Sequence, residues 1–243
     1  MNHVKTPASL IFLSGLGSTP KLFALQKEKF PQLLTPPWLK PIENESVDHY
    51  LERWVKQLNL TEPVIVGGAS FGGMIAQRIA SKIGANHCLL FGSIKSRSEI
   101  PWRIRLLRPV HRLAFKWIIR FWQIVVLMFV WLFGFLISQR THSVLRQFSS
   151  SDPTLVKWSI RVFFQFFDDH SSSLLCRNQL KIHQIHGTHD PVFPASLIEK
   201  NEQTEIHFIQ NAGHLLTLSA ADQVNSIISQ VISSHSQFKA NDN

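Results

Sequence analysis

Short, mostly apolar runs alternate along much of the chain with segments in which apolar residues recur every three or four positions. The apolar runs cover residues 8–13, 64–66, 87–91, 180–186 and 204–209. Helical spacing is found at residues 21–30, 46–58, 74–83, 194–199 and 219–233. Apolar runs of this length are typical of strands buried in a parallel sheet. Their alternation with helices predicts an α/β fold, with a mainly parallel sheet covered by helices on both faces.

This alternation stops between residues 94 and 169. Glycine is nearly absent there, Trp and Phe are frequent, and residues 121–139 contain no charged side chain. Four basic residues spaced by four precede that run: Arg108, Arg112, Lys116 and Arg120. A helix that begins near Pro109 would place all four on one stripe. We expect residues 1–93 and 170–243 to form one core, with a helical insert at 94–169.

Nearly all of the net charge lies in this insert. The 243-residue chain has a net charge of +9. Residues 95–161 contain 12 Lys and Arg and two acids, Glu99 and Asp152, so this segment carries +10 and the rest of the chain −1. Because the basic residues are concentrated, they need a local explanation rather than one based on solubility.

One serine stands where an apolar run changes into a helical segment. Gly68-Ala69-Ser70-Phe71-Gly72 matches the pattern G-x-S-x-G, directly after the run that ends at Val66. Small residues on both sides allow a sharp strand-to-helix turn that exposes the hydroxyl group. Ser70 is therefore the candidate nucleophile.

Asp190 and His214 follow the last two predicted strands. Reacting groups gather beyond the carboxyl ends of strands in open α/β sheets, and the order Ser, Asp, His is the order of a triad in this architecture. A serine hydroxyl needs a base to take its proton and a group that orients the base. We expect His214 to be that base and Asp190 to orient it. The backbone N–H groups of Leu16 and Phe71 are expected to form the oxyanion hole.

No cofactor or metal is expected from the sequence patterns. His183, His186 and His189 form H-x-x-H-x-x-H, but alternation along a strand sends the first two to opposite faces. No Walker loop is present, and Gly15 and Gly17 lack the third glycine of a dinucleotide fingerprint.

Four motifs resemble those of the α/β-hydrolase superfamily. They lie at residues 13–18, 68–73, 186–194 and 211–214, and the resemblance covers residues 8–94 and 178–234. In that family the second motif holds the nucleophile, the third the acid and the fourth the base, which implies these roles for Ser70, Asp190 and His214. The chain is most similar in kind to small bacterial esterase-like members. The leading strand hairpin of the family is absent, so the sheet should be about two strands shorter than the usual eight.

The resemblance implies a serine hydrolase that cleaves an ester or thioester with an apolar acyl group through an acyl-enzyme on Ser70. Esterases, lipases, thioesterases and acyltransferases share these residues, so an acyltransferase on the same triad stays open. A non-catalytic receptor for an apolar ligand is the alternative from another class. Three intact triad candidates weigh against it, because a receptor needs none of them.

Two interpretations of the insert also stay open. In relatives, an insert at this place is a cap that walls the substrate pocket. Alternatively, a helix rich in Trp and Phe with basic flanks suits the surface of an anionic membrane. The 19 uncharged residues are at the low end of the length needed for a crossing and include Gln123 and Gly134, which disfavours one. Nucleic-acid binding is disfavoured, because the aromatic residues are mixed with long aliphatic ones.

The cellular location is inferred from cysteine usage and the N-terminus. Cys88 and Cys176 suit neither a disulfide framework nor a metal cage, and no signal-peptide pattern is present. We expect a cytoplasmic protein, with peripheral contact to the inner membrane as the second interpretation of the insert.

Overall fold

The computed structural model describes residues 9–43, 45–58, 64–109, 116–133, 139–166 and 180–241. Within them, six strands form one sheet in the order β2-β1-β3-β4-β5-β6, and all neighbouring pairs are parallel. The strands are β1 (Ser9–Leu13), β2 (Leu33–Leu34), β3 (Val64–Ala69), β4 (His87–Phe91), β5 (Lys181–Gly187) and β6 (Thr204–Ile209). The predicted α/β fold with a shortened, mainly parallel sheet is confirmed.

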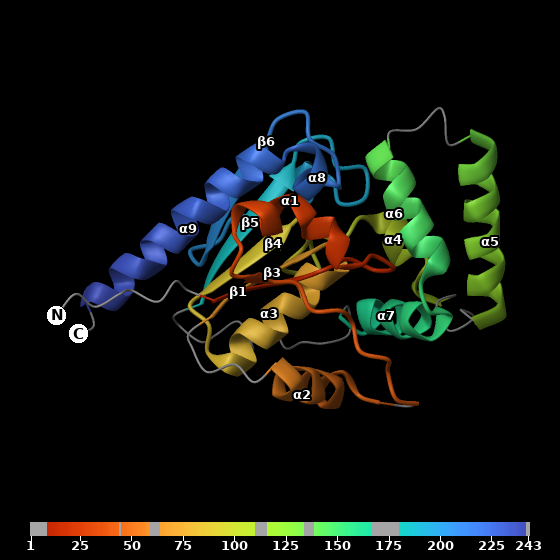
Figure 1. Ribbon diagram of the computed structural model, residues 1–243, viewed down its shortest axis with the longest axis horizontal. Helices are drawn as coiled ribbons and strands as arrows, with labels where there is room; N and C mark the ends of the chain where they lie inside the picture. Colours follow the sequence, from red (N-terminus) through yellow and green to blue (C-terminus); the bar gives the residue numbers. More distant parts are fainter. Residues whose placement is uncertain are drawn as a thin grey trace.

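Helices cover both faces of the sheet (Figure 1). One face carries α2 (Val47–Leu58) and α3 (Phe71–Ile83); the other carries η1 (Pro20–Phe23), α1 (Ala24–Lys29), α8 (Leu216–Ser219) and α9 (Ala221–Asn241). Ser46 caps the start of α2, since its hydroxyl accepts a 3.2 Å hydrogen bond from the N–H of His49.

Two helices differ from the prediction. The expected helix at 194–199 is a single 3-10 turn, η5 (Ala195–Leu197), because Ile198 already has an extended backbone with φ −76° and ψ 120°. The expected helix at 219–233 is divided into α8 and α9, and α9 continues to Asn241. Ala220 causes the division, because its φ of −131° and ψ of 40° are not helical.

Side chains of the central strands alternate between two apolar layers. Ile11 and Val66 are fully buried in the layer with α2 and α3, whereas Leu10 and Ile65 are fully buried in the layer with α1, α8 and α9. Burial on both faces explains why these strands read as apolar runs in the sequence. The sheet is therefore a rigid support for the loops at its carboxyl edge.

The segment between β4 and β5 contains α4 (Trp102–Arg105), α5 (Lys116–Phe133), α6 (Gln139–Ser150) and α7 (Pro153–Gln165). These helices, called the helical insert below, lie beside one end of the sheet, with α5 farthest from it (Figure 1). The uncharged run at 121–139 is divided between two helices, since α5 ends at Phe133 and α6 begins at Gln139. Residues 110–115 lie outside the described residues. They include Arg112 of the basic stripe, and they directly follow Pro109, where a helix was predicted to begin.

Polar and aromatic contacts attach the helical insert to the core. On α6, the side-chain oxygen of Gln147 accepts hydrogen bonds from the N–H and hydroxyl of Thr19, at 2.9 and 2.7 Å. On α7, the Trp158 ring packs on Tyr50 with 4.1 Å between ring centroids. The Arg161 guanidinium donates a 2.8 Å hydrogen bond to the carbonyl of Glu45. These contacts hold the insert against the loop that follows β1 and against α2 with the segment before it.

Candidate active site

Ser70 occupies the turn between β3 and α3 with φ 52° and ψ −122°. Among the described residues other than glycine, only Ser70 and Asn211 have a positive φ. Such a conformation costs about 1–3 kcal/mol for a residue with a side chain and is found mainly at functional sites. Ser70 remains partly exposed, so the strained turn keeps its hydroxyl within reach of a ligand.

Close backbone packing at this turn requires glycine at positions 68 and 72. A Cβ atom on Gly68 would lie 2.3 Å from the carbonyl of Gly72, and one on Gly72 would lie 2.3 Å from the carbonyl oxygen of Leu13. Both neighbours are backbone atoms, which cannot move aside as the end of a side chain can. The two glycines of G-x-S-x-G therefore let β1, β3 and the start of α3 meet around Ser70.

The structure brings Asp190 and His214 together. His214 Nδ1 lies 2.8 Å from Asp190 Oδ2, although the two residues follow different strands. The Phe193 ring contacts the imidazole edge to face, with 5.6 Å between ring centroids. Because an ionised carboxylate only accepts hydrogen bonds, His214 Nδ1 is the donor in this contact, which leaves Nε2 as the nitrogen that can accept a proton.

Asp190 is held in its ionised form by its hydrogen bonds. Its other oxygen, Oδ1, accepts hydrogen bonds from the N–H groups of Val192 and Phe193, at 2.8 and 3.0 Å. Burial alone would raise the pKa of Asp190, but the hydrogen bond from His214 and those two N–H groups bring the pKa below its usual value. The carboxylate is therefore charged and fixed in orientation at neutral pH.

The strand β4 lies between β3, which Ser70 follows, and β5, which Asp190 follows. The Ser70 N–H donates a 3.0 Å hydrogen bond to the carbonyl of Phe91, the last residue of β4. The next residue, Gly92, has φ +52°, and a Cβ on it would lie 2.9 Å from the carbonyl oxygen of His214 and 3.5 Å from Asp190 Oδ2. Gly92 thus lies directly between the turn of Ser70 and the Asp190–His214 pair. Within the described residues, the Ser70 hydroxyl makes no hydrogen bond.

The loop after β1 approaches Ser70 from the other side. A Cβ on Gly15 would lie 3.5 Å from Ser70 Cβ, and the hydroxyl of Ser14 donates a 3.2 Å hydrogen bond to the carbonyl of Ser18 across this loop. The backbone N–H groups of Leu16 and Phe71 have no acceptor among the described residues. The structure therefore leaves both donors available next to the serine.

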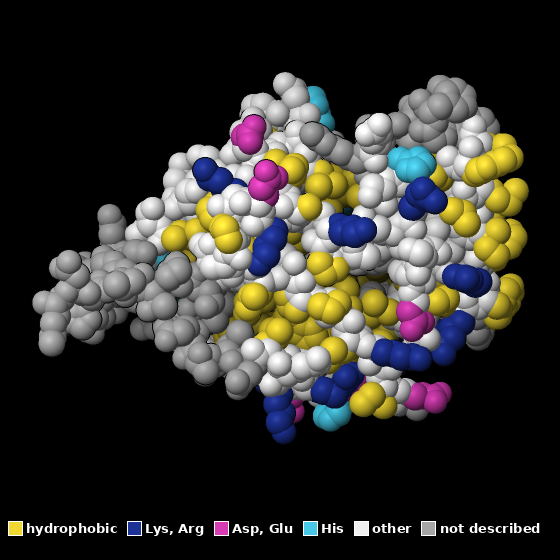
Figure 2. Space-filling model, viewed as in Figure 1, with side chains coloured by type: hydrophobic (Ala, Val, Ile, Leu, Met, Phe, Trp, Pro, Cys, Tyr) yellow, Lys and Arg dark blue, Asp and Glu magenta, His cyan; other side chains and the backbone are white. Residues whose placement is uncertain are grey.

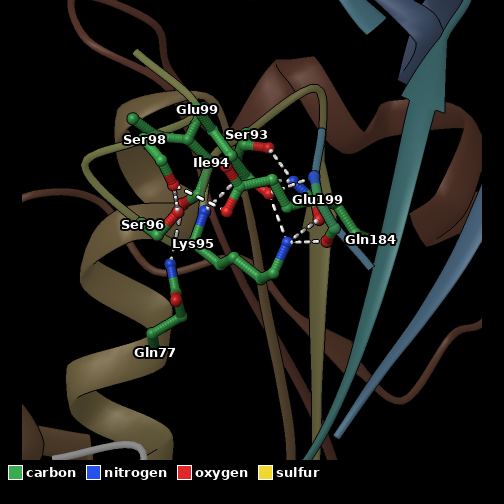
Figure 3. Close-up of polar contacts among 9 residues, drawn as sticks. All are labelled: Gln77, Ser93, Ile94, Lys95, Ser96, Ser98, Glu99, Gln184 and Glu199. Carbon is green, nitrogen blue, oxygen red and sulfur yellow. Dashed lines mark hydrogen bonds and ion pairs between the residues drawn. The ribbon is translucent and has the colours of Figure 1, made fainter. Parts of the chain in front are cut away.

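Sequence reasoning missed a buried polar network between β5 and the loop that follows β4 (Figure 3). Lys95 and Glu99 form a fully buried ion pair, with exposures of 5% and 0%. Gln184 of β5 connects to both, with its side-chain oxygen 3.2 Å from Lys95 Nζ and its amide nitrogen 2.9 Å from Glu99 Oε2. The backbone N–H of Glu199 also donates to Glu99, at 3.0 Å. The network therefore joins the loop after β4 to β5 and to the segment that follows Asp190.

This network ends at the backbone of Ser70. The amide nitrogen of Gln184 donates a 3.0 Å hydrogen bond to the carbonyl of Ser93, and the Ser93 hydroxyl donates a 2.6 Å hydrogen bond to the carbonyl of Ser70. The one available signal in the sequence was Glu99, a lone acid among basic residues and four residues from Lys95. The partners Gln184 and Glu199 are too distant in the chain for any spacing rule to find.

His186 has a supporting position as well. Its Nε2–H donates a 2.7 Å hydrogen bond to the carbonyl of Phe193, and the ring is fully buried. This bond closes the loop that contains Asp190, so His186 supports the position of that carboxylate.

Known structures share this architecture. No protein-family model matches the chain, and no curated protein matches it. A thermophilic esterase from Thermogutta terrifontis is 17% identical, with a TM-score of 0.71, and the match covers 94% of this chain and 90% of that one. MenH from S. aureus is 16% identical, with a TM-score of 0.71 and 96% of both chains covered. A putative lipase from Acinetobacter baumannii is 18% identical, with a TM-score of 0.69, covering 98% of this chain and 86% of that one.

The chain has the α/β-hydrolase fold. The fold predicted from the four sequence motifs is therefore confirmed.

Proposed function

We propose that this protein is a serine hydrolase that cleaves an ester or thioester with an apolar acyl group through an acyl-enzyme on Ser70. The observation that carries the proposal is the 2.8 Å contact between His214 Nδ1 and Asp190 Oδ2, which is separated only by β4 from the strand before a serine with φ 52°. The esterase and the lipase among the similar structures support the reaction class.

The first half-reaction uses the three side chains in sequence. His214 Nε2 takes the proton of the Ser70 hydroxyl while Oγ attacks the acyl carbon, and Asp190 stabilises the imidazolium that forms. The negative oxygen of the tetrahedral intermediate is stabilised by the free N–H groups of Leu16 and Phe71. The imidazolium then gives its proton to the departing alcohol or thiol, which leaves the acyl group on Ser70.

Water completes the reaction in a hydrolase. His214 accepts a proton from the water as it attacks the acyl carbon, and the proton returns to Ser70 Oγ as the acid leaves. In an acyltransferase another nucleophile takes the place of water, with the same residues in the same roles. The non-catalytic receptor is less well supported, because a receptor gains nothing from backbone strain at Ser70 or from an oriented imidazole.

Apolar groups around the serine support an apolar acyl group. The Phe71 ring lies between Trp38 of the core and Trp158 of the insert, at 5.7 and 6.2 Å between ring centroids. Met74, one turn into α3, packs in a buried cluster with Phe193. The side chains packed around the turn of Ser70 are therefore apolar, which suits a substrate with an apolar acyl group.

Fluorophosphonate labelling and ester turnover test this function together. The wild type should be labelled and should hydrolyse p-nitrophenyl esters of graded chain length, and Ser70→Ala should lose both properties. Ser233→Ala, an exposed serine on α9, is the matched control and should retain both. Labelling of Ser70→Ala at the wild-type rate would show that the nucleophile is elsewhere. Labelling of the wild type without turnover of any ester would favour the acyltransferase.

We also propose that α5 contacts an anionic membrane surface. Large apolar side chains on this helix are exposed, up to 82% at Trp131, and Figure 2 shows hydrophobic side chains along the edge where α5 lies, with Lys and Arg beside them. The exposed set is Trp117, Phe121, Trp122, Ile124, Leu127, Met128, Phe129, Trp131 and Leu132. A patch of this kind with basic neighbours suits the interface of a bilayer with anionic headgroups. In the described part of the chain, no helix is long and apolar enough to cross a membrane.

Vesicle sedimentation tests the surface of α5. Binding to anionic vesicles should exceed binding to neutral ones and weaken as salt is added, because each basic residue near the surface contributes about 1 kcal/mol and salt screens it. Trp131→Ser should reduce binding, whereas Phe208→Ser, an exposed aromatic residue on β6, should not. If Trp131→Ser and Phe208→Ser bound anionic vesicles equally well, α5 would not be the membrane-contacting surface.

A further inference from the structure

A second cluster of chemically active side chains lies far from Ser70, towards the amino ends of β5 and β6. His183 is the third residue of β5, whereas Asp190 follows the carboxyl end of the same strand. In the register of the sheet, His183 is paired with Glu205, and His207 is two residues further along β6. Side chains paired across strands, and those two apart on one strand, lie on the same face. The strand register therefore places the side chains of His183, Glu205 and His207 next to one another on one face of the sheet.

Their ligand atoms converge. His183 Nδ1 lies 3.6 Å from Glu205 Oε2, and His207 Nε2 lies 3.5 Å from Glu205 Oε1. One nitrogen or oxygen from each side chain lies within 4.8 Å of the other two. Tetrahedral zinc, with bonds of about 2.0–2.1 Å, requires ligand atoms about 3.3 Å apart. Only small side-chain movements are needed to reach that spacing.

Two of these atoms lack any other role in the structure. His183 Nδ1 and His207 Nε2 are buried and have no hydrogen-bond partner within the described part of the chain. The His183 side chain is only 3% exposed, and a buried nitrogen without a partner carries a free-energy cost. A bound cation would remove that cost for both nitrogens.

His183 has a hydrogen-bonding neighbour at its second ring nitrogen, as metal-binding histidines generally do. Its other nitrogen, Nε2, lies 3.0 Å from Nδ1 of the buried His87 on β4. If Nε2–H donates to His87, the lone pair of His183 is on Nδ1 and faces Glu205. Metal-binding histidines generally fix their tautomer and ring orientation through such a hydrogen bond at the second nitrogen.

We propose that His183, Glu205 and His207 bind a divalent transition-metal ion, with zinc as the best match. Two imidazoles and one carboxylate are ligands that zinc accepts, and a water molecule can complete a tetrahedral site. The Glu205 side chain is 45% exposed, so the ion can enter from solvent on that side. Because β6 is the edge strand, the ion would attach it to β5 and act on stability rather than on the reaction at Ser70.

Lys181 competes for the same carboxylate. Its Nζ lies 2.7 Å from Glu205 Oε2, and its side chain is 52% exposed, so it can turn into solvent when an ion binds. Loss of this lysine should therefore strengthen metal binding. A cluster that served only as a surface ion pair would show no such effect.

Zinc titration of the full chain, without a histidine tag and after treatment with a chelator, tests the site. The wild type should bind one zinc ion in competition with a chromophoric chelator, and Co²⁺ should produce the visible absorption of a tetrahedral site. His207→Ala and Glu205→Gln should each weaken zinc binding at least about tenfold, and Lys181→Met should strengthen it. His142→Asn, a histidine on α6, is the control and should bind as the wild type does.

His207 and Glu205 are suitable positions because neither side chain is deeply buried, so both variants should fold. Zinc should raise the Tm of the wild type but not of His207→Ala. Wild-type protein that binds no zinc, or a His207→Ala variant that binds as tightly as the wild type, would overturn the proposal.

Discussion

The hydroxyl of Ser93 donates a 2.6 Å hydrogen bond to the carbonyl oxygen of Ser70. This contact supports the backbone of the strained turn from the loop that follows β4. Because Ser93 is itself hydrogen-bonded to Gln184, the conformation of the turn is linked to the buried pair of Lys95 and Glu99. The proposed nucleophile therefore depends on residues that touch no substrate.

Ser93→Ala should lower ester turnover while leaving the fold intact. One hydrogen bond is worth about 1 kcal/mol, so kcat should fall about fivefold if the bond supports the reactive position of Ser70. The loss should appear in kcat rather than in KM. Ser96→Ala is the matched control, because the Ser96 hydroxyl is hydrogen-bonded to the Ser98 hydroxyl at the surface. An unchanged kcat in Ser93→Ala would limit the role of this bond to packing.

Asp190→Asn should remove most of the turnover without unfolding the protein. An asparagine amide donates a hydrogen bond, so it would favour the tautomer of His214 with the proton on Nε2, which then cannot accept the proton of Ser70. A loss of about 10³–10⁴ in kcat is expected by analogy with other triads. Steady-state kinetics with the best p-nitrophenyl ester measures it. A loss of less than about tenfold would argue against His214 as the base.

Glu99→Gln should destabilise the protein by about 3–5 kcal/mol, because it leaves the buried Lys95 ammonium without its counter-ion. Lys95→Met in the same chain removes that unpaired charge, so the double variant should be more stable than Glu99→Gln alone. Urea denaturation of the wild type, both single variants and the double variant gives the coupling energy. Additive effects of the two substitutions would mean that the ion pair contributes nothing specific.

Gly72→Ala should prevent folding or strongly reduce soluble yield, since its Cβ would lie 2.3 Å from the carbonyl oxygen of Leu13. Gly213→Ala is the control, because the nearest atom to its Cβ would be 3.8 Å away. Far-UV circular dichroism and Tm distinguish the two variants. Equal Tm values would show that the turn around Ser70 can open to accommodate a methyl group.

The stability contributed by Glu45 should depend on pH. Its carboxylate accepts hydrogen bonds from Arg53, from the N–H of Ile42 and from His49, and chiefly the bond from Arg53 lowers its pKa from 4.5 to about 2. A lowered carboxyl pKa stabilises the fold fully above about pH 4.5, and the effect is lost as the pH falls towards 2. The Tm difference between wild type and Glu45→Gln should therefore be largest at neutral pH and decrease below pH 4.5. Glu43→Gln, an exposed neighbour, should show no such trend. A difference that is constant with pH would contradict this role.

Local patterns in the sequence determined every strand of the described residues except the two-residue β2, most helices and the turn around Ser70. A buried parallel strand needs apolar side chains on both faces, as Ile11 and Leu10 show, and a sharp strand-to-helix turn needs glycine next to the serine. Asp190 and His214 were also predictable, because each stands directly after a strand and the carboxyl ends of parallel strands meet at one edge.

Only the tertiary structure decided which distant polar side chains meet. The contact of Gln184 with Glu99 spans 85 positions of the chain, and that of Glu199 with Glu99 spans 100. The cluster of His183, Glu205 and His207 depends on the register between two strands, and a search for repeats within one strand cannot detect it. The spacing of apolar residues indicates which face of a single helix or strand is buried. The register between strands and the packing of loops depend on contacts throughout the core, so no local pattern predicts them.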